Sequence, residues 1–428
     1  MDFLDNMALY PSSEHIVLLK VIIGLMLLVH MPYISILLGG SLFSLFFSML
    51  DKREPNATHL RFSKDLIHLI TSKKSAPILL GVLPLLSLIL SFAQLYQGSD
   101  LKITQYLLIV SLFSISGFIL LYLFKSSFEK REQQFSTHVL LGLGVFVAFM
   151  VGYLIFSATT SLMFFPEKWN FVYTSFPIFV YENELPRAAL FLFFTFAFTA
   201  AAILYFFLSW PGRKEIDATY GDFIRKFGAV VGLIFVLLIP IVVVWNLITF
   251  PDVAASESVF AVWGVTLLLL LITAILFNSI IKSQNRKLVT STFILFLVTF
   301  GVMSVNDRIA AGNARYEQEK LLAAKADEIH QEILAARAAK SAAATQINGE
   351  EIFTNICTAC HQFDQRVVGP PYMSVLAKYE NDKDALVQFI MNPSKIDTDY
   401  PPMPNQNLRK PEASAVADYL LQEYVNRK

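Results

Sequence analysis

Eight long apolar segments fill the first 304 residues, and they constrain the fold more than any other feature of the sequence. A helix needs about 20 mostly apolar residues to cross a bilayer. Because lipid offers no hydrogen-bond partners, a spanning segment must satisfy its backbone internally, as a helix does. The segments cover residues 17–49, 76–97, 104–124, 137–164, 187–210, 227–250, 259–281 and 288–304. We therefore predict an all-α fold in which residues 1–304 form a polytopic transmembrane helix bundle.

The composition supports this fold class and excludes two others. The chain is 55% hydrophobic and 16% charged, whereas soluble proteins carry about 25% charged residues, so an ordinary soluble enzyme is excluded. Lys plus Arg and Asp plus Glu number 34 each, so the chain lacks the excess positive charge of a nucleic-acid-binding protein. We expect no nucleic-acid partner.

The distribution of Lys and Arg predicts the orientation of the bundle, because cytoplasmic loops are enriched in both. The loops after the second, fourth and sixth segments carry only Lys102, Lys168 and Arg187 between them. The loops after the first, third, fifth and seventh segments carry Lys52, Arg53, Arg61, Lys64, Lys73, Lys74, Lys125, Lys130, Arg131, Arg213, Lys214, Arg225, Lys226, Lys282, Arg286 and Lys287. The first segment is over-long and lacks a basic n-region, so we expect it to stay as an anchor. The prediction is a multi-pass protein of the bacterial cytoplasmic (inner) membrane with both termini on the periplasmic side.

Residues 305–349 are predicted to form a polar helical spacer with a hinge at its end. The stretch up to residue 346 is rich in Ala, contains no Pro, and places Glu317 and Lys320 at helical spacing. Two interpretations remain open: a solvated spacer, or a docking helix for another subunit. The thin apolar stripe that a docking helix would use comprises Leu322, Ile329, Ile333 and Leu334.

Residues 350–428 are predicted to form a separate small domain. Because a domain of this size has a small apolar core, we expect a covalent cross-link or a bound metal to stabilise it. The two cysteines of the chain occur here, in Cys357-Thr358-Ala359-Cys360-His361. This C-x-x-C-H pattern is the attachment signature of c-type haem, with His361 as an iron ligand. A redox dithiol or half of a zinc site is disfavoured, because a His follows directly and no second Cys pair exists.

The sixth iron ligand is expected downstream of the C-x-x-C-H pattern. Residues 350–428 contain no second His, so a Met thioether is the remaining strong candidate. Met373, Met391 and Met403 compete for this role. We favour Met403, because the prolines on both sides stiffen an extended loop that can hold the sulfur against the iron.

The pattern of residues 350–428 resembles a class I cytochrome c. The matching features are the Cys357–His361 segment, the Gly369-Pro370 turn, the Met403 loop and a closing helix over 412–424. The resemblance implies one covalent haem c, and a Pro370 carbonyl that accepts a hydrogen bond from His361 Nδ1. It also implies attachment outside the cytoplasm, in agreement with the orientation predicted from charge.

Parts of the membrane region resemble subunit I of cytochrome bd-type quinol oxidases. His30 followed nine residues later by Gly39, His138 at the start of the fourth segment, and the stretch 153–166 carry this resemblance. It implies a haem b ligated by His30; the alternatives are a His bonded to a neighbouring helix or lining a polar pocket. His138 is either a second ligand or, as usual for such a position, solvated. The third segment lacks the glutamates of that family, the fifth lacks its ligating His, and the loop 251–258 is too short for its quinol-binding loop.

These features predict a membrane-bound c-type cytochrome subunit of a respiratory electron-transfer complex, with one His/Met haem c on the periplasmic side. The first alternative is a bd-like terminal oxidase subunit I whose haem c feeds membrane haems, with a subunit II-like chain as partner. The second is a non-redox scaffold that tethers a cytochrome domain. Expected partners are other membrane subunits, a periplasmic electron carrier or oxidase, and lipid or quinone. No residue is assigned a catalytic role, and catalysis by this chain alone stays open.

Overall fold

The structure is a computed structural model that describes residues 10–99, 103–171, 184–213, 215–345 and 347–428. In these ranges every regular element is a helix and no strand occurs. The chain divides into two compact units, Met1–Glu328 and Ile329–Lys428. The prediction of an all-α chain with a membrane bundle is confirmed.

Among the described residues of the first unit, eight helical segments are long and apolar enough to cross a membrane. The elements are α2 (Ser13–Arg53), α3 (Ala57–Ile70), η1 (Pro77–Val82), α4 (Leu83–Leu95), α5 (Ile103–Ser127), α6 (Phe135–Leu162), η2 (Pro166–Phe171), α7 (Glu184–Leu204), η4 (Tyr205–Ser209), α8 (Ala218–Ile248), η5 (Asp252–Ala254), α9 (Glu257–Lys282) and α10 (Arg286–Ala314). Helix α11 (Tyr316–Thr345) begins in this unit and crosses into the second.

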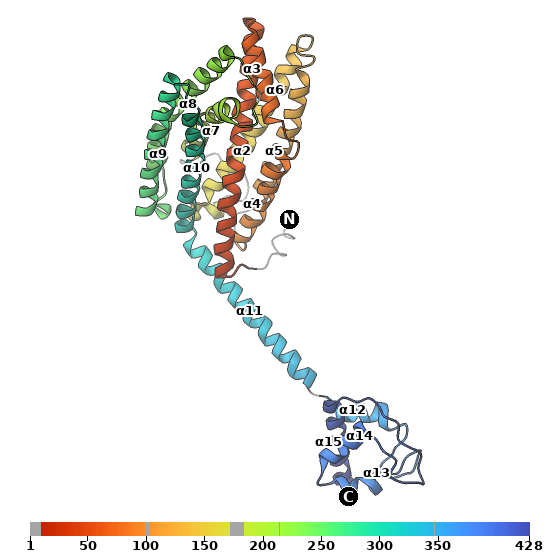
Figure 1. Ribbon diagram of the computed structural model, residues 1–428. Helices are drawn as coiled ribbons and strands as arrows, with labels where there is room; N and C mark the ends of the chain where they lie inside the picture. Colours follow the sequence, from red (N-terminus) through yellow and green to blue (C-terminus); the bar gives the residue numbers. More distant parts are fainter. Residues whose placement is uncertain (1–9, 100–102, 172–183, 214, 346) are drawn as a thin grey trace. The chain divides into compact units, whose positions relative to one another are not determined.

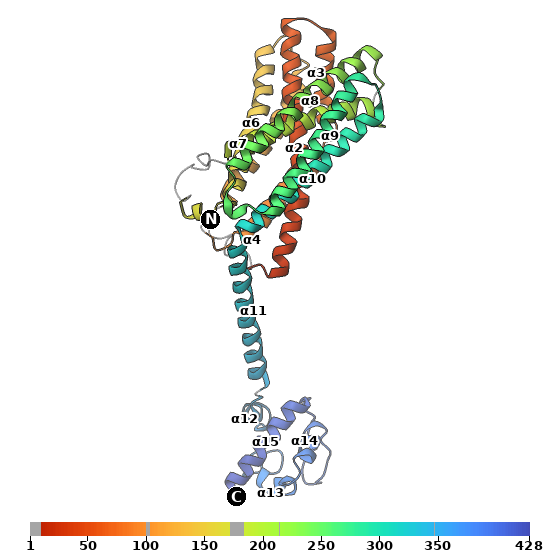
Figure 2. The same cartoon turned by 90° about the vertical axis from the view of Figure 1, so that its left-hand side faces the viewer.

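Helix α2 runs through the middle of the bundle. It contacts α4 and α6 on one side and α7 and α10 on the other, as Figure 1 shows. Figure 2 shows α9 and α10 side by side on one flank, in agreement with their contacts. At 1.5 Å per residue the 41 residues of α2 extend for about 60 Å, twice the hydrocarbon thickness. The amphipathic α3 packs against α2.

Polar side chains at the ends of the apolar runs determine where several membrane helices begin. The side-chain oxygens of Ser12, Asp217 and Ser256 accept hydrogen bonds from the backbone N–H groups of the first turns of α2, α8 and α9. Each cap satisfies a donor that has no partner inside the helix. These capping residues therefore determine the residue at which each of the three helices begins.

The eight predicted segments correspond to the eight helices, with one difference at the last. The sequence places the end of the eighth segment at residue 304 and starts a polar helix there. Helix α10 instead continues to Ala314, and its last turns are buried in the bundle through Asn306, Ala310 and Ala311. Because these small and polar residues lower the hydropathy, the apolar pattern misses this packed end.

The first turns of α11 are attached to the bundle by a buried polar group. Glu319 accepts a hydrogen bond from Lys20 Nζ on α2 at 2.5 Å and pairs with Arg315 Nε at 3.4 Å. Arg315 also bonds the Tyr96 hydroxyl at 3.2 Å, and Leu322 is 2% exposed against the same region. The start of the predicted spacer thus docks on the chain's own bundle, whereas Ile333 and Leu334 further along are exposed.

The second unit is a small helical domain with its own apolar core. Its elements are α12 (Gly349–Ile352), η6 (Phe353–Cys357), α13 (Tyr372–Val375), η7 (Leu376–Tyr379), α14 (Lys383–Met391) and α15 (Lys410–Arg427). Helices α12 and α14 both pack on α15. Gly349 lies against the backbone of Ala415, and a Cβ at this position would overlap the Ala415 carbonyl. Only glycine allows the two terminal helices to approach this closely.

A similar close approach joins α2 to α7 in the bundle. A Cβ at Gly39 would overlap the side chain of Thr199, whose hydroxyl donates a hydrogen bond to the Ser35 carbonyl at 3.0 Å. Small residues at helix contacts let backbones pack closely in a membrane, where hydroxyls can bond across helices. This contact anchors α7 and its neighbours to the central helix.

Replacement of Gly39 with Ala is expected to destabilise the bundle by about 1–3 kcal/mol, because overpacking would force α2 away from α7. Gly24→Ala on the same helix is the matched control, since a Cβ there meets no atom within 4 Å and Ala favours helix formation. Thermal unfolding of the purified protein in detergent, followed by circular dichroism, measures both. Equal melting temperatures for the two variants would contradict the tight α2–α7 contact.

Candidate haem site

The C-x-x-C-H segment lies at the end of the short π-helix η6 and in the turn that follows. The backbone N–H groups of Cys360 and His361 donate to the Cys357 carbonyl at 3.1 and 3.0 Å. The chain then folds back, and Gly369 N donates to the Cys360 carbonyl at 2.8 Å. This turn presents both thiols and the imidazole from one continuous backbone segment.

The His361 imidazole is oriented by the turn that follows it. Its Nδ1 lies 3.1 Å from the Pro370 carbonyl oxygen. Because a carbonyl can only accept, Nδ1 carries the proton and Nε2 has a free lone pair. Gly369 packs flat against the ring, where any Cβ would overlap it. The hydrogen bond expected for Pro370 is therefore present.

A cavity of about 250 Å³ lies beside this segment in the second unit. Cys357, Cys360 and His361 line it, and so does Met403. Apolar side chains make up much of the remaining lining, among them Ile356, Val368, Leu376, Phe389, Ile390 and Leu420. This donor set in an apolar cavity suits a flat macrocycle held by two thiols, with one imidazole and one thioether for its metal.

The position of the cavity distinguishes among the three methionines considered as the sixth iron ligand. Met403 lines the cavity, whereas Met373 and Met391 pack against the apolar core of the unit. A fixed contact supports the Met403 loop, since the Arg366 guanidinium donates to the Asp399 carbonyl at 2.8 Å. The same guanidinium stacks 4.3 Å above the ring of Tyr400. No sequence pattern indicated a role for Arg366.

No disulfide joins Cys357 and Cys360. Burial raises the pKa of the Cys357 thiol, and burial also raises the pKa of the neighbouring Tyr372 hydroxyl. Before haem is attached, Cys357 is therefore mainly a protonated thiol near neutral pH. A thiol in this state requires activation before it adds to another group.

Fold and site together define a small helical haem-binding domain at the C-terminal end of a multi-pass membrane bundle. The profile of the family described as Cytochrome c matches residues 346–423. Cytochrome c-552 of Nitrosomonas europaea is 36% identical over 72 residues, which are 16% of this chain and 69% of that protein. Cytochromes c-551 of Pseudomonas denitrificans and Azotobacter vinelandii are each 34% identical over 77 residues, which are 17% of this chain and 94% of those proteins.

Through this unit, the chain belongs to the cytochrome c family. It carries covalently bound haem c, because that attachment defines the family. The chain has only two cysteines, so Cys357 and Cys360 are the residues available for the two thioether bonds.

The membrane histidine His30 is buried, with 5% of its surface exposed, on the face of α2 that meets η1. Its Nδ1 lies 3.3 Å from the Leu80 carbonyl of that π-helix. This is the alternative in which the His bonds a neighbouring helix. The ring does not line either cavity described for this protein. The structure thus gives His30 a packing role, and the described residues around it show no feature of a haem b site.

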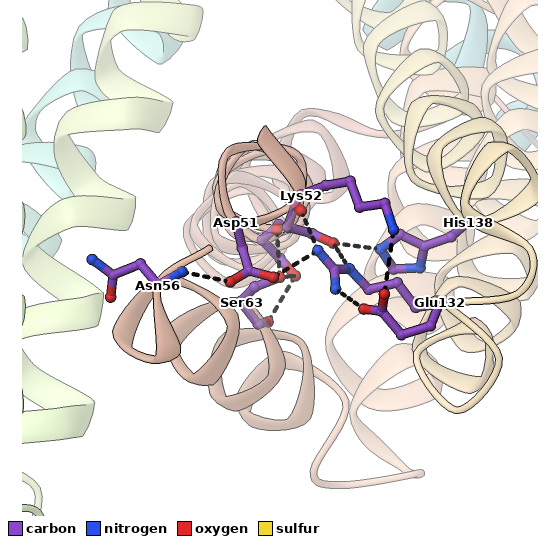
Figure 3. Close-up of polar contacts among 9 residues, drawn as sticks. Asp51, Lys52, Asn56, Ser63, Glu132 and His138 are labelled. Atoms are coloured by element: carbon purple, nitrogen blue, oxygen red, sulfur yellow. Dashed lines mark hydrogen bonds and ion pairs between the residues drawn. The ribbon is translucent and has the colours of Figure 1, made fainter. Parts of the chain in front are cut away.

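The expectation that His138 is solvated is wrong. The ring is fully buried, with Nε2 at 2.8 Å from the Ser48 hydroxyl and Nδ1 at 2.7 Å from the Ser127 hydroxyl. Both nitrogens are engaged, so neither is free to bind a metal. Figure 3 shows His138 facing Asp51 and Lys52 at the end of α2.

Sequence reasoning treated Arg131 only as a loop charge, but it is 2% exposed at the centre of this cluster. Its guanidinium donates to the Ser48 carbonyl at 2.6 Å and to Asp51 at 2.9 Å. A buried charge must be paired and hydrogen-bonded to be tolerated. The cluster therefore joins α2 to the start of α6, a structural role rather than a cofactor site.

Single replacement of Cys357 or Cys360 with Ala is expected to leave haem attached by one thioether, and the double replacement to abolish covalent attachment. Mass spectrometry of the denatured chain measures this, with one haem per wild-type chain expected. Thr358→Ala, in the same turn, is the control and should retain the haem mass. Covalent haem in the double variant would contradict the assignment, because no other cysteine exists.

Proposed function

We propose that this protein is a membrane-bound electron carrier whose haem c is ligated by His361 and Met403. The observation that carries the proposal is the cavity that brings both residues together with Cys357 and Cys360. Within a respiratory complex, the unit would accept an electron from a donor and pass it to a periplasmic carrier or oxidase. Other membrane subunits are the expected partners of the bundle.

When bound, the haem supplies an iron that changes its charge by one electron. The chain's residues make this exchange easy by keeping the surroundings fixed. The Pro370 carbonyl holds the His361 ring in one orientation, and Arg366 fastens the loop that carries Met403. The apolar lining excludes water, and Met ligation raises the reduction potential. The unit is therefore suited to accept electrons from a low-potential donor.

The location of the second unit on the periplasmic side rests on two arguments. Basic residues gather in alternate loops, which orients an eight-helix bundle with both ends outside. The attachment of haem c outside the cytoplasm, implied by the family, requires the same side. The two arguments are independent.

Among the described residues of the bundle, no observation supports the oxidase alternative. His138 has both nitrogens occupied by serine hydroxyls, and His30 bonds a backbone carbonyl. The scaffold alternative leaves the oriented His361 and the Met403 cavity without a role. We therefore retain electron transfer as the proposed function.

Met403→Leu is expected to remove the weak far-red absorption of Met-ligated ferric haem and to lower the midpoint potential. Met373→Leu is the matched control, because its side chain packs in the apolar core rather than at the cavity. Absorption spectra and a redox titration of the purified protein measure both effects. A persisting band in the Met403 variant would overturn the ligand assignment.

In the predicted orientation, successive loops of the bundle lie on opposite sides of the membrane. An enzyme fused at each position reveals the side on which it lies. Alkaline phosphatase fused after Lys428 should be active, because it folds only outside the cytoplasm. The same enzyme fused in the loop between α8 and α9 should also be active, whereas a fusion between α9 and α10 should be inactive. Activity in the reverse pattern would contradict the periplasmic location.

A further inference from the structure

A second cavity, of about 110 Å³, lies inside the membrane bundle. It is lined by the last turns of α6, the first turns of α7, and residues of α2, α8, α9 and α10. This is the end of the bundle where α10 leads into α11, and thus where the chain leaves for the haem-binding unit. Neither the haem site nor the proposed electron transfer uses this cavity.

An ion pair at the cavity marks it as more than a packing defect. Arg187 and Asp307, both lining residues, pair at 2.9 Å between α7 and α10. The Arg187 guanidinium also stacks 4.7 Å from the ring centre of Phe164. Ionisable residues in membrane helices are costly and indicate functional sites. Because Asp307 neutralises Arg187, the pair favours a neutral polar ligand over an anionic one.

Buried polar groups with incomplete hydrogen bonding lie in the same place. The Ser157 hydroxyl lines the cavity and is buried. It lies close to the buried Glu184 carboxyl, which Ser161 also approaches, but none of these oxygens forms a hydrogen bond of good geometry within the described ranges. A bound ligand with oxygen atoms would satisfy the Ser157 hydroxyl more fully.

Several of the remaining lining residues are aromatic. Tyr153 and Phe191 stack with ring centres 3.8 Å apart and planes within 16°. Phe156, Phe194, Phe300 and Trp263 also line the cavity. A planar ring packs well against aromatic side chains. An apolar cavity of about 150 Å³ binds one benzene ring, so this cavity has room for one six-membered ring at most.

Helices α2 and α10 are in contact. Their lining residues, Leu27 and Met31 on α2 and Met303 and Ser304 on α10, are half-buried, whereas the lining residues on α6 are buried. An opening between α2 and α10 would let an apolar molecule dissolved in the bilayer reach the cavity from its side. A long apolar tail would remain outside, along the same opening.

From this geometry, we propose that the cavity binds the headgroup of a membrane quinone or quinol. The ring lies among the aromatic walls, one oxygen bonds Ser157 and the other faces the Arg187–Asp307 pair. A quinol oxygen bonded to Ser157 has the Glu184 carboxyl directly behind that hydroxyl. The inference goes beyond the proposed function, since it places a site for the electron donor within this chain, and it does not depend on haem ligation.

Binding is tested on the purified full-length protein in nanodiscs with decylubiquinone, a single-ring quinone, as the probe. A quinone seated beside Trp263 should quench its fluorescence in a saturable manner. Trp263→Phe should remove most of the quenching. Trp210→Phe should leave it unchanged, because Trp210 follows η4, at the opposite end of α7.

Ser157→Ala should weaken quinone binding about five-fold through the lost hydrogen bond. Ser91→Ala is the matched control: Ser91 is another buried serine of the bundle, on α4, and it does not line the cavity, so affinity should be unchanged. Haem content and melting temperature verify that each variant is folded.

No saturable quenching in the wild type, or equal affinity for both serine variants, would overturn the proposal and identify a water-filled cavity. The proposed electron transfer would stand in that case, because ascorbate reduction of the haem measures it separately. Conversely, quinone binding by a protein whose haem cannot be reduced would refute the function and leave this site intact.

Discussion

The hydrogen bond between His361 and the Pro370 carbonyl is the constraint on which the second unit depends. It fixes the protonated nitrogen of the ring, and thereby determines which nitrogen faces the cavity. Gly369 makes it possible, because only a residue without a Cβ leaves room for the imidazole beside the turn. The same turn bonds back to the Cys360 carbonyl, so the thiols and the ring are positioned by one network of backbone contacts.

The two units divide the work of a membrane electron carrier. The second unit carries haem c, and Cys357, Cys360, His361 and Met403 line its largely apolar cavity. The first unit contains a cavity with an ion pair and a buried serine hydroxyl at the end from which α11 continues. If that cavity binds quinol as proposed, the chain unites the site of an apolar, two-electron donor with a one-electron acceptor.

Much of this arrangement was predictable from the sequence, for clear physical reasons. Hydropathy identifies each membrane helix locally, and the C-x-x-C-H pattern combines attachment and ligation in five consecutive residues. The proline-flanked Met403 was likewise evident. What escaped depends on tertiary packing: the buried state of His138, the pairing of Arg131 with Asp51, and the last turns of α10. The membrane cavity was unpredictable because six helices far apart in sequence contribute to it.

The central position of α2 has a consequence for how the protein is made. Helix α2 precedes its packing partners in the chain, and its Ser35 and Ser44 are bonded by residues of α7 and α3, which follow it. During synthesis, these polar groups have no partner until the later helices are made. The contacts of α2 are therefore complete only after α10, the last helix of the bundle that packs against it, has been made.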